Sequence, residues 1–314
     1  MTAVSDWKLK NYLKDGLREM GFCGVGFASP GMVDEETRSH CLEWLHLGYH
    51  GSMGWLRQSM PVRLDVRKFY PEVKTVVSLA FPWGRPEGKG EFLSGYAWLT
   101  DYHRVLEQKL KDFRSLLKRK FPEIRLRTTV DTSPVLEKYW AVQAGLGWMG
   151  KNTLLVTPEY GSWVFLATLL INVPLTPDLK KEDRCGRCRL CLEACPTGAL
   201  RKAYLLNATR CLAYLTVEHN QPLTAEEKTL LQGAVFGCDR CQVVCPFNQP
   251  SEKETCHLKQ RQPANTALLK ELATINHEEF QRRFGQTPVI RIGWEKFRAQ
   301  VLAALNYYQE QGMR

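Results

Sequence analysis

The stretch that decides the architecture of this chain is CGRCRLCLEACP, at residues 185–196. Its cysteines are separated by two, two and three residues, and a proline follows the last of them. Three thiolates at the two-residue spacing can wrap a tight loop around three corners of a cubane cluster. The fourth serves another cluster, because the proline turns the chain away. The stretch therefore predicts a pair of [4Fe–4S] clusters.

A second cysteine run completes the ligand count. It reads CDRCQVVCP, at residues 238–246, and lacks one leading cysteine, whose place Cys211 can fill. The doubled pattern is that of bacterial ferredoxins, in which each run lends its last cysteine to the other cluster. The first predicted ligand set is Cys185, Cys188, Cys191 and Cys245, and the second is Cys195, Cys211, Cys238 and Cys241.

The competing interpretation of this segment is a pair of zinc sites. Zinc ribbons use two C-x2-C pairs, but not three consecutive short steps that end in Cys-Pro. Nine of the 11 cysteines fall between Cys185 and Cys256. In a reducing compartment, clustered cysteines are more often metal ligands or catalysts than disulfides. Cys23, Cys41 and Cys256 are left over, and we expect them to be free thiols.

Ahead of the cysteines, helical and strand patterns alternate. The predicted helices cover 6–20, 35–47, 101–121 and a stretch from Pro134 to Gly145, and the predicted strands cover 23–28, 74–81, 125–130 and 162–171. The pattern is helical again over 263–308. We expect an α+β protein with an α/β domain over 1–178, a ferredoxin-like two-cluster domain over 179–255 and a short helical C-terminal segment over 256–314.

Composition and charge narrow the class of protein. The chain has 314 residues, of which 44% are hydrophobic and 24% charged, which excludes a disordered tail, a collagen-like fibre and a bare coiled coil. Its longest apolar stretch, 163–175, is too short to span a membrane, and no export signal opens the chain. We therefore expect a cytoplasmic monomer with no membrane partner. The net charge of +10 favours a nucleic-acid partner, with solubility alone as the alternative.

Asp131 is the most suggestive acid in the leading domain. It lies between a predicted strand and a helix that we expect to begin at Pro134. It is either a helix cap or a general acid beside a reduced centre. The segment around Asp101 and His103 approaches the Asp-x-His-x-x-Gly pattern of a corrin ligand, but Leu106 stands where glycine is needed. We therefore expect His103 to be a packing or surface residue.

Two clusters only carry single electrons, so the leading domain should hold their acceptor: a flavin, a corrinoid or a substrate radical. The chain has no G-x-G-x-x-G after a strand and no Walker A motif. The glycine-rich stretch at residues 145–151 follows a predicted helix. It is either a turn or a place where backbone approaches a flat cofactor closely.

Motifs along nearly the whole chain resemble those of the epoxyqueuosine reductase family. They are Asp101-Tyr102-His103, Val130-Asp131-x-x-Pro134, Ala144-Gly145-x-Gly147-Trp148, Gly150-Lys151-Asn152, Thr157-Pro158-Glu159-x-Gly161-Ser162, Tyr214-Leu215-Thr216-x-Glu218, and Gly237-Cys238-Asp239-x-Cys241-Gln242 with Cys245-Pro246-x-Asn248. The resemblance implies a nitroreductase-like, cobalamin-binding domain that carries the ferredoxin-like insert.

It further implies that base-off cobalamin, reduced through the two clusters, removes the epoxide oxygen of epoxyqueuosine at the wobble position of tRNA. The partners would be a tRNA anticodon stem-loop and an unidentified electron donor. Asp131 matches the family's proton donor, a role that a pKa raised by burial would favour. The implied cobalamin contacts are Arg63, Ser94, Asp131, Leu155, Leu166 and Thr216.

Two other functions compete with this one. A corrinoid reductive dehalogenase-like enzyme shares the two clusters and the cobalamin, but such enzymes usually carry a twin-arginine export signal. A ferredoxin-type electron carrier needs no substrate, but it leaves the leading ~180 residues without a role, since two clusters need only a short domain.

Overall fold

The computed structural model describes residues 6–84, 92–248 and 266–312. Cys256 and the predicted boundary at 255–256 lie outside the described residues. Among the described residues, no helix combines the length and the apolar character needed to cross a lipid bilayer.

A four-stranded sheet forms the centre of the leading domain, and each neighbouring pair of its strands is antiparallel. The strand order is β1 (Gly24–Ala28), β2 (Thr75–Pro82), β6 (Val164–Ile171) and β3 (Leu126–Thr129). All eight residues of β2 are buried. Helices therefore have to cover both faces of this strand.

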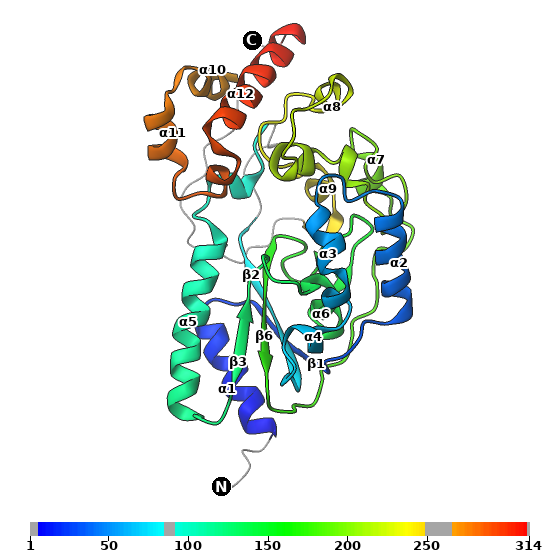
Figure 1. Cartoon of the computed structure of the whole chain (residues 1–314), viewed down its shortest axis with the longest axis vertical. Helices are drawn as coiled ribbons and strands as arrows, with labels where there is room; N and C mark the ends of the chain where they lie inside the picture. The colour runs from blue at the N-terminus through cyan, green and yellow to red at the C-terminus, as the bar shows by residue number, and fades with distance from the viewer. Residues whose placement is uncertain (1–5, 85–91, 249–265, 313–314) are drawn as a thin grey trace.

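Figure 1 shows how helices cover the two faces of the sheet. On one side α1 (Asp6–Glu19) and α5 (Tyr102–Lys120) pack against Val77. On the other side α6 (Glu137–Gln143) packs against Val76. Successive side chains of a strand point to opposite faces, so the continuous apolar run of β2 contributes to both layers.

Most of the predicted elements are confirmed. The helices predicted over 6–20, 35–47 and 101–121 correspond to α1, α2 (Glu35–His46) and α5, and the four predicted strands correspond to β1, β2, β3 and β6. Periodicity was sufficient here because each element buries one regular set of apolar side chains.

The helix predicted to begin at Pro134 is the exception. It begins at Glu137 as α6, so residues 130–136 form a loop. Two tight backbone hydrogen bonds shape this loop, from Thr132 N to Val130 O at 2.6 Å and from Val135 N to Ser133 O at 2.8 Å. Backbone groups that are already bonded this locally cannot form the first turn of a helix.

The remaining elements are short until the C-terminus. They are α3 (Gly54–Arg63), α4 (Val66–Phe69), η1 (Gly95–Trp98), the hairpin of β4 (Trp148–Met149) and β5 (Leu155–Val156), α7 (Leu190–Glu193), η2 (Ala208–Arg210), η3 (Tyr214–Glu218), α8 (Ala225–Leu230), α9 (Arg240–Val243) and η4 (Pro246–Asn248). The predicted cysteine-rich segment thus contains only brief helical turns between its loops.

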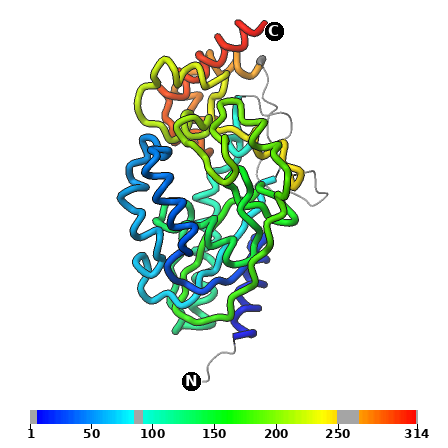
Figure 2. Tube along the Cα trace, turned by 90° about the vertical axis from the view of Figure 1, so that its right-hand side faces the viewer, coloured from blue at the N-terminus to red at the C-terminus, as the bar shows by residue number. Residues whose placement is uncertain are grey.

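The helical pattern predicted over 263–308 is confirmed, and it consists of α10 (Thr266–Thr274), α11 (His277–Phe284), η5 (Pro288–Ile292) and α12 (Gly293–Glu310). It shares one hydrophobic core with Phe92, Val235 and Phe236. The segment therefore packs on the cysteine-rich region rather than forming a separate body. Figures 1 and 2 show it at the opposite end of the molecule from the N-terminus.

Candidate cluster sites and active site

The first group of cysteines surrounds one small cavity, which is lined by Cys185, Cys188, Cys191 and Cys245. Burial, followed by the charges of the other three cysteines, raises the pKa of the Cys191 thiol. Cys245 comes from the second run and closes the ring. The structure thus brings together the first of the two ligand sets predicted from spacing.

The second group lies deeper in the protein. Burial raises the pKa of the Cys241 thiol well above its usual range, and the nearby Cys238, Cys211 and Cys195 raise it further. Burial and then Cys195 also raise the pKa of the Cys211 thiol, against the effect of backbone hydrogen bonds. The four members of the second predicted set are therefore mutual neighbours, and Cys211 occupies the place of the missing leading cysteine.

The donor chemistry of both groups fits [4Fe–4S] clusters, because each offers four thiolates and a cubane binds one thiolate at each of its irons. A site for one metal ion is a different case: among the described residues, no three His, Cys, Asp or Glu side chains lie close enough together to hold a single ion. The ten described cysteines are all free of disulfides. Of the cysteines left over, Cys23 donates to Ala80 O at 3.3 Å, and Cys41 lines a different cavity next to Lys138.

The glycine-rich stretch forms a wall of the first cysteine cavity. Lys151 Nζ donates to the carbonyl oxygens of Gly186 and Cys188, at 2.5 and 2.8 Å, and so ties the cysteine loop to the β4–β5 hairpin. A Cβ on Gly147 would lie 2.0 Å from Val156 O. Glycine is required there because the two backbone segments touch. The stretch is thus a close backbone turn beside the cysteines.

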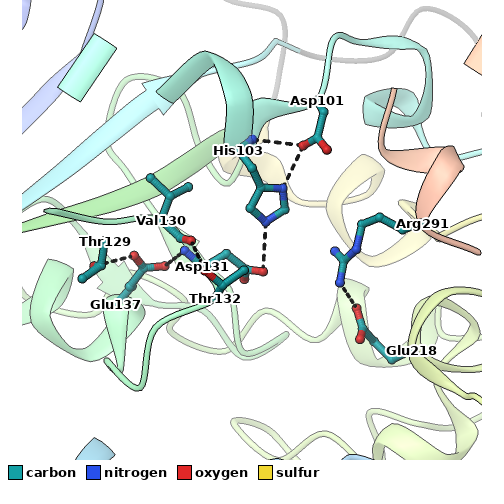
Figure 3. Close-up of polar contacts among 9 residues, drawn as sticks. All are labelled: Asp101, His103, Thr129, Val130, Asp131, Thr132, Glu137, Glu218 and Arg291. Atoms are coloured by element: carbon teal, nitrogen blue, oxygen red, sulfur yellow. Dashed lines mark hydrogen bonds and ion pairs between the residues drawn. The ribbon is translucent and has the colours of Figure 1, made fainter. Parts of the chain in front are cut away.

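Asp131 faces a histidine from another element. His103 Nε2 lies 3.2 Å from Asp131 Oδ2, while His103 Nδ1 lies 2.8 Å from Asp101 Oδ1 (Figure 3). Asp101 is the N-cap of α5 and also accepts the His103 backbone N–H. The imidazole is therefore held between two carboxylates, and its ring orientation is set by the start of the helix.

The hydrogen bonds of His103 to the two aspartates determine which of these side chains is protonated. Burial alone would lower the pKa of His103, but its hydrogen bonds to Asp101 and Asp131 outweigh burial and raise that pKa to about 9. The His103 hydrogen bond lowers the pKa of Asp131, although burial opposes it. The expectation that burial raises the pKa of Asp131 is therefore wrong: at neutral pH the proton lies on His103.

The capping interpretation of Asp131 is also wrong. The N-cap of α6 is Leu136, and Asp131 caps no helix. Its backbone is left-handed, with φ of 55°. Half of its side chain, 51%, is exposed, while that of His103 is 13% exposed. Asp131 thus presents an accessible carboxylate whose partner is protected from water.

Three further groups surround Asp131: Glu137 and Arg291, which the sequence did not single out, and Arg63, which it indicated only as an implied cobalamin contact. Glu137 Oε2 accepts the Asp131 backbone N–H at 3.1 Å. Arg63 donates to Val135 O at 3.4 Å, and its charge lowers the pKa of Asp131, as does that of Arg291. In Figure 3 Arg291 pairs with Glu218, across the site from His103. The Asp-x-His spacing at a helix start is the sequence signal that indicated Asp101 and His103.

The predicted cobalamin contacts fall into three places. Arg63 lies near Asp131. Leu155 and Leu166 share one hydrophobic cluster. Ser94 and Thr216 flank Gly237, because Thr216 Oγ1 accepts the Gly237 N–H and Ser94 Cβ is the nearest atom to a Cβ placed there. Ser94, Leu155 and Thr216 are buried, whereas Leu166 and Asp131 keep accessible surface.

Two family models match parts of the chain. "Epoxyqueuosine reductase QueG, DUF1730" matches residues 63–132, and "4Fe-4S double cluster binding domain" matches residues 184–248. Curated epoxyqueuosine reductases are similar over most of their length. The protein from Atelocyanobacterium thalassa is 36% identical, over 93% of this chain and 98% of its own, and the protein from Gloeobacter violaceus is 37% identical, over 93% and 94%.

Solved epoxyqueuosine reductases have the same fold. One, from Bacillus subtilis, has its catalytic aspartate loop swung out of the active site. It superposes with a TM-score of 0.84 at 30% identity, covering 98% of this chain and 84% of its own. Another, solved with an epoxyqueuosine-modified tRNA stem loop, superposes with a TM-score of 0.83 at 30% identity and the same coverage.

Proposed function

This chain belongs to the epoxyqueuosine reductase family of oxidoreductases and carries a [4Fe–4S] double-cluster domain, and from that premise we propose its electron path and proton donor. Electrons pass singly through two [4Fe–4S] clusters to a cobalamin, and the epoxide of epoxyqueuosine in tRNA is reduced there. The observation that carries the proposal is the grouping of eight cysteines into two separate sets of four neighbours.

The cysteines hold the electron path. Cys185, Cys188, Cys191 and Cys245 ligate one cluster, and Cys195, Cys211, Cys238 and Cys241 ligate the other. Each set takes one cysteine from the opposite run, which ties the two clusters into one short unit. Lys151 supports the first cluster by binding the carbonyls of its loop.

Cobalamin, when bound, supplies the reducing electrons at the epoxide. Asp131 and Leu166 are the predicted contacts with accessible surface to offer it, and Arg63 is buried but carries a charge. The buried Ser94, Leu155 and Thr216 would support the residues that touch it. Arg63 is held in place by Ser59 Oγ, which accepts its Nε–H at 2.9 Å.

Asp131 and His103 supply the proton. Removal of the oxygen breaks both C–O bonds, forms a C=C bond and releases water, so it consumes two electrons and two protons. The half-exposed Asp131 carboxylate faces the substrate. The protected His103 imidazolium passes its Nε2 proton to Asp131 Oδ2, and Asp131 passes that proton to the leaving oxygen. The second proton comes from solvent water, which reaches the accessible side of Asp131. The catalytic aspartate loop of the Bacillus subtilis relative supports this role.

The substrate is the anticodon stem-loop of a tRNA. The solved complex of a relative with a modified tRNA stem loop supports this partner. The net charge of +10 suits a ligand lined with phosphates.

The test is reduction of epoxyqueuosine-containing tRNA by protein purified without oxygen, with nucleosides identified by mass spectrometry. We expect queuosine to appear only when a reductant and cobalamin are present. Reduction of an organohalide but not of the tRNA would favour a dehalogenase-like enzyme. Full cluster content without either activity would favour an electron carrier. Queuosine formed without cobalamin would overturn the proposed electron path.

A further inference from the structure

The loop that carries Asp131 is held by two contacts from different sides. The Asp131 carboxylate meets His103 on α5, and its backbone N–H donates to Glu137 Oε2 at 3.1 Å. The other oxygen of Glu137, Oε1, lies 3.3 Å from Thr129 Oγ1 at the end of β3. Glu137 is the first residue of α6, so this one carboxyl group joins the strand, the loop and the helix (Figure 3).

The backbone contact holds an unfavourable conformation. The backbone φ angle of Asp131 is 55°, a value that residues other than glycine rarely adopt. Such a residue persists only where the surrounding structure holds it, and such residues concentrate at active sites. Without an acceptor for its N–H, Asp131 would lose the contact that fixes its backbone while its carboxylate stays half exposed.

We propose that Glu137 is a positioning residue for Asp131, and that it holds the Asp131 loop in place in its neutral form. The carboxyl groups of Glu137 and Asp131 are neighbours in space. Ionising both would place two negative charges side by side, so ionisation of one disfavours ionisation of the other. A neutral carboxyl still accepts the Asp131 N–H through its carbonyl oxygen. Its hydroxyl oxygen, Oε1, can still accept from Thr129 Oγ1, so both contacts are kept.

The surrounding charges agree with this assignment. Burial, and then the charge of Asp131, raises the pKa of Glu137 to about 8, although Arg63 and the two hydrogen bonds oppose the rise. His103 and Arg291 face Asp131 rather than Glu137, and Lys138 also interacts with Asp131. Asp131 therefore keeps the negative charge that pairs with His103, while Glu137 stays protonated at neutral pH. Above about pH 8, a second negative charge would form beside Asp131 and repel it.

This inference rests on the proposed function for its activity readout, but not for its structural one. Three variants of the holoenzyme separate the possibilities. Glu137→Gln keeps a carbonyl acceptor and removes the titration, Glu137→Ala removes both, and Glu123→Gln changes an exposed glutamate as a matched control.

At pH 7 we expect E137Q to turn over within about threefold of wild type and E137A to lose on the order of 10²-fold, the usual effect of a misplaced catalytic group. The fall in wild-type activity near pH 8 should move to higher pH in E137Q, where His103 titrates. A wild-type rate for E137A, or a wild-type pH profile for E137Q, would overturn the proposal.

Amide hydrogen exchange gives a readout without turnover. The amide hydrogens of the peptide that covers residues 130–136 should exchange faster in E137A than in wild type. Their exchange rate should be unchanged in E137Q and E123Q. Equal protection in all four proteins would overturn the positioning role even if none of them reduces epoxyqueuosine. Loss of turnover in every protein, with the exchange pattern intact, would overturn only the proposed function.

Discussion

His103 Nε2 and Asp131 Oδ2 lie 3.2 Å apart, across 28 residues of sequence, and together they place an imidazolium behind an accessible carboxylate. A carboxylate that is half exposed and has a lowered pKa is a poor acid by itself. In the proposed function, its pairing with a protonated histidine makes it the outer member of a two-group proton donor.

Asp131→Asn keeps the size of the side chain but removes the acid. We expect the variant to retain both clusters and tRNA binding and to lose about 10²–10⁴-fold in turnover, the usual contribution of general acid catalysis. Rates and iron content are compared with Asp15→Asn, which changes an exposed aspartate on α1. Wild-type turnover by D131N would assign protonation to another group.

His103→Gln tests the pH dependence of the pair. Because the folded-state pKa of His103 is raised to about 9, its stabilisation is complete below its unfolded pKa of about 6.5 and is lost as pH rises through about 9. Between these two pH values, the free energy of unfolding of the wild-type protein should therefore fall by about 1–2 kcal/mol more than that of H103Q. This figure is reduced because Asp131 is half exposed and solvent screens the pair. Urea titrations at pH 6 and pH 9.5 measure the difference. Parallel curves would contradict the contact.

Cys211→Ala tests the displaced ligand. Protein purified without oxygen should contain about eight irons, and C211A about four, because one cluster loses a ligand. Cys23→Ala and Cys41→Ala serve as controls and should keep the full content. Full iron in C211A would remove Cys211 from the ligand set.

Lys151→Met tests support of the first cluster. Losing the hydrogen bonds to Gly186 and Cys188 loosens the loop that carries three of the ligands. We expect K151M to lose about four irons to a chelator faster than wild type and to keep the other four, since one cubane holds four. Lys8→Met alters an exposed lysine on α1 as the control. Equal rates of loss would show that the contact does not protect the cluster.

The affinity for tRNA should fall steeply with salt. Binding that neutralises phosphates releases counterions, so the logarithm of the association constant should decline linearly with the logarithm of salt concentration. Fluorescence anisotropy of a labelled stem-loop over a salt series measures the slope. A flat plot would assign the net charge of +10 to solubility alone.

Features that depend on neighbours in the sequence were predictable from it. The alternation of apolar residues located the sheet strands and the long helices, because each element buries a regular set of side chains. The spacing of the cysteines indicated two sets of four, because a thiolate loop around a cubane allows few spacings. The sequence also singled out Asp131, although for the wrong local reason, since the helix it was expected to precede begins only at Glu137.

The protonation of the site was decided by the tertiary structure alone. The sequence predicts His103 to be a packing or surface residue and does not single out Glu137, because nothing in their local sequence shows that α5 and α6 bring both to the Asp131 loop. A pKa depends on charges and burial through space. The lowered pKa of Asp131 and the raised pKa values of His103 and Glu137 therefore exist only once the strands and helices have packed.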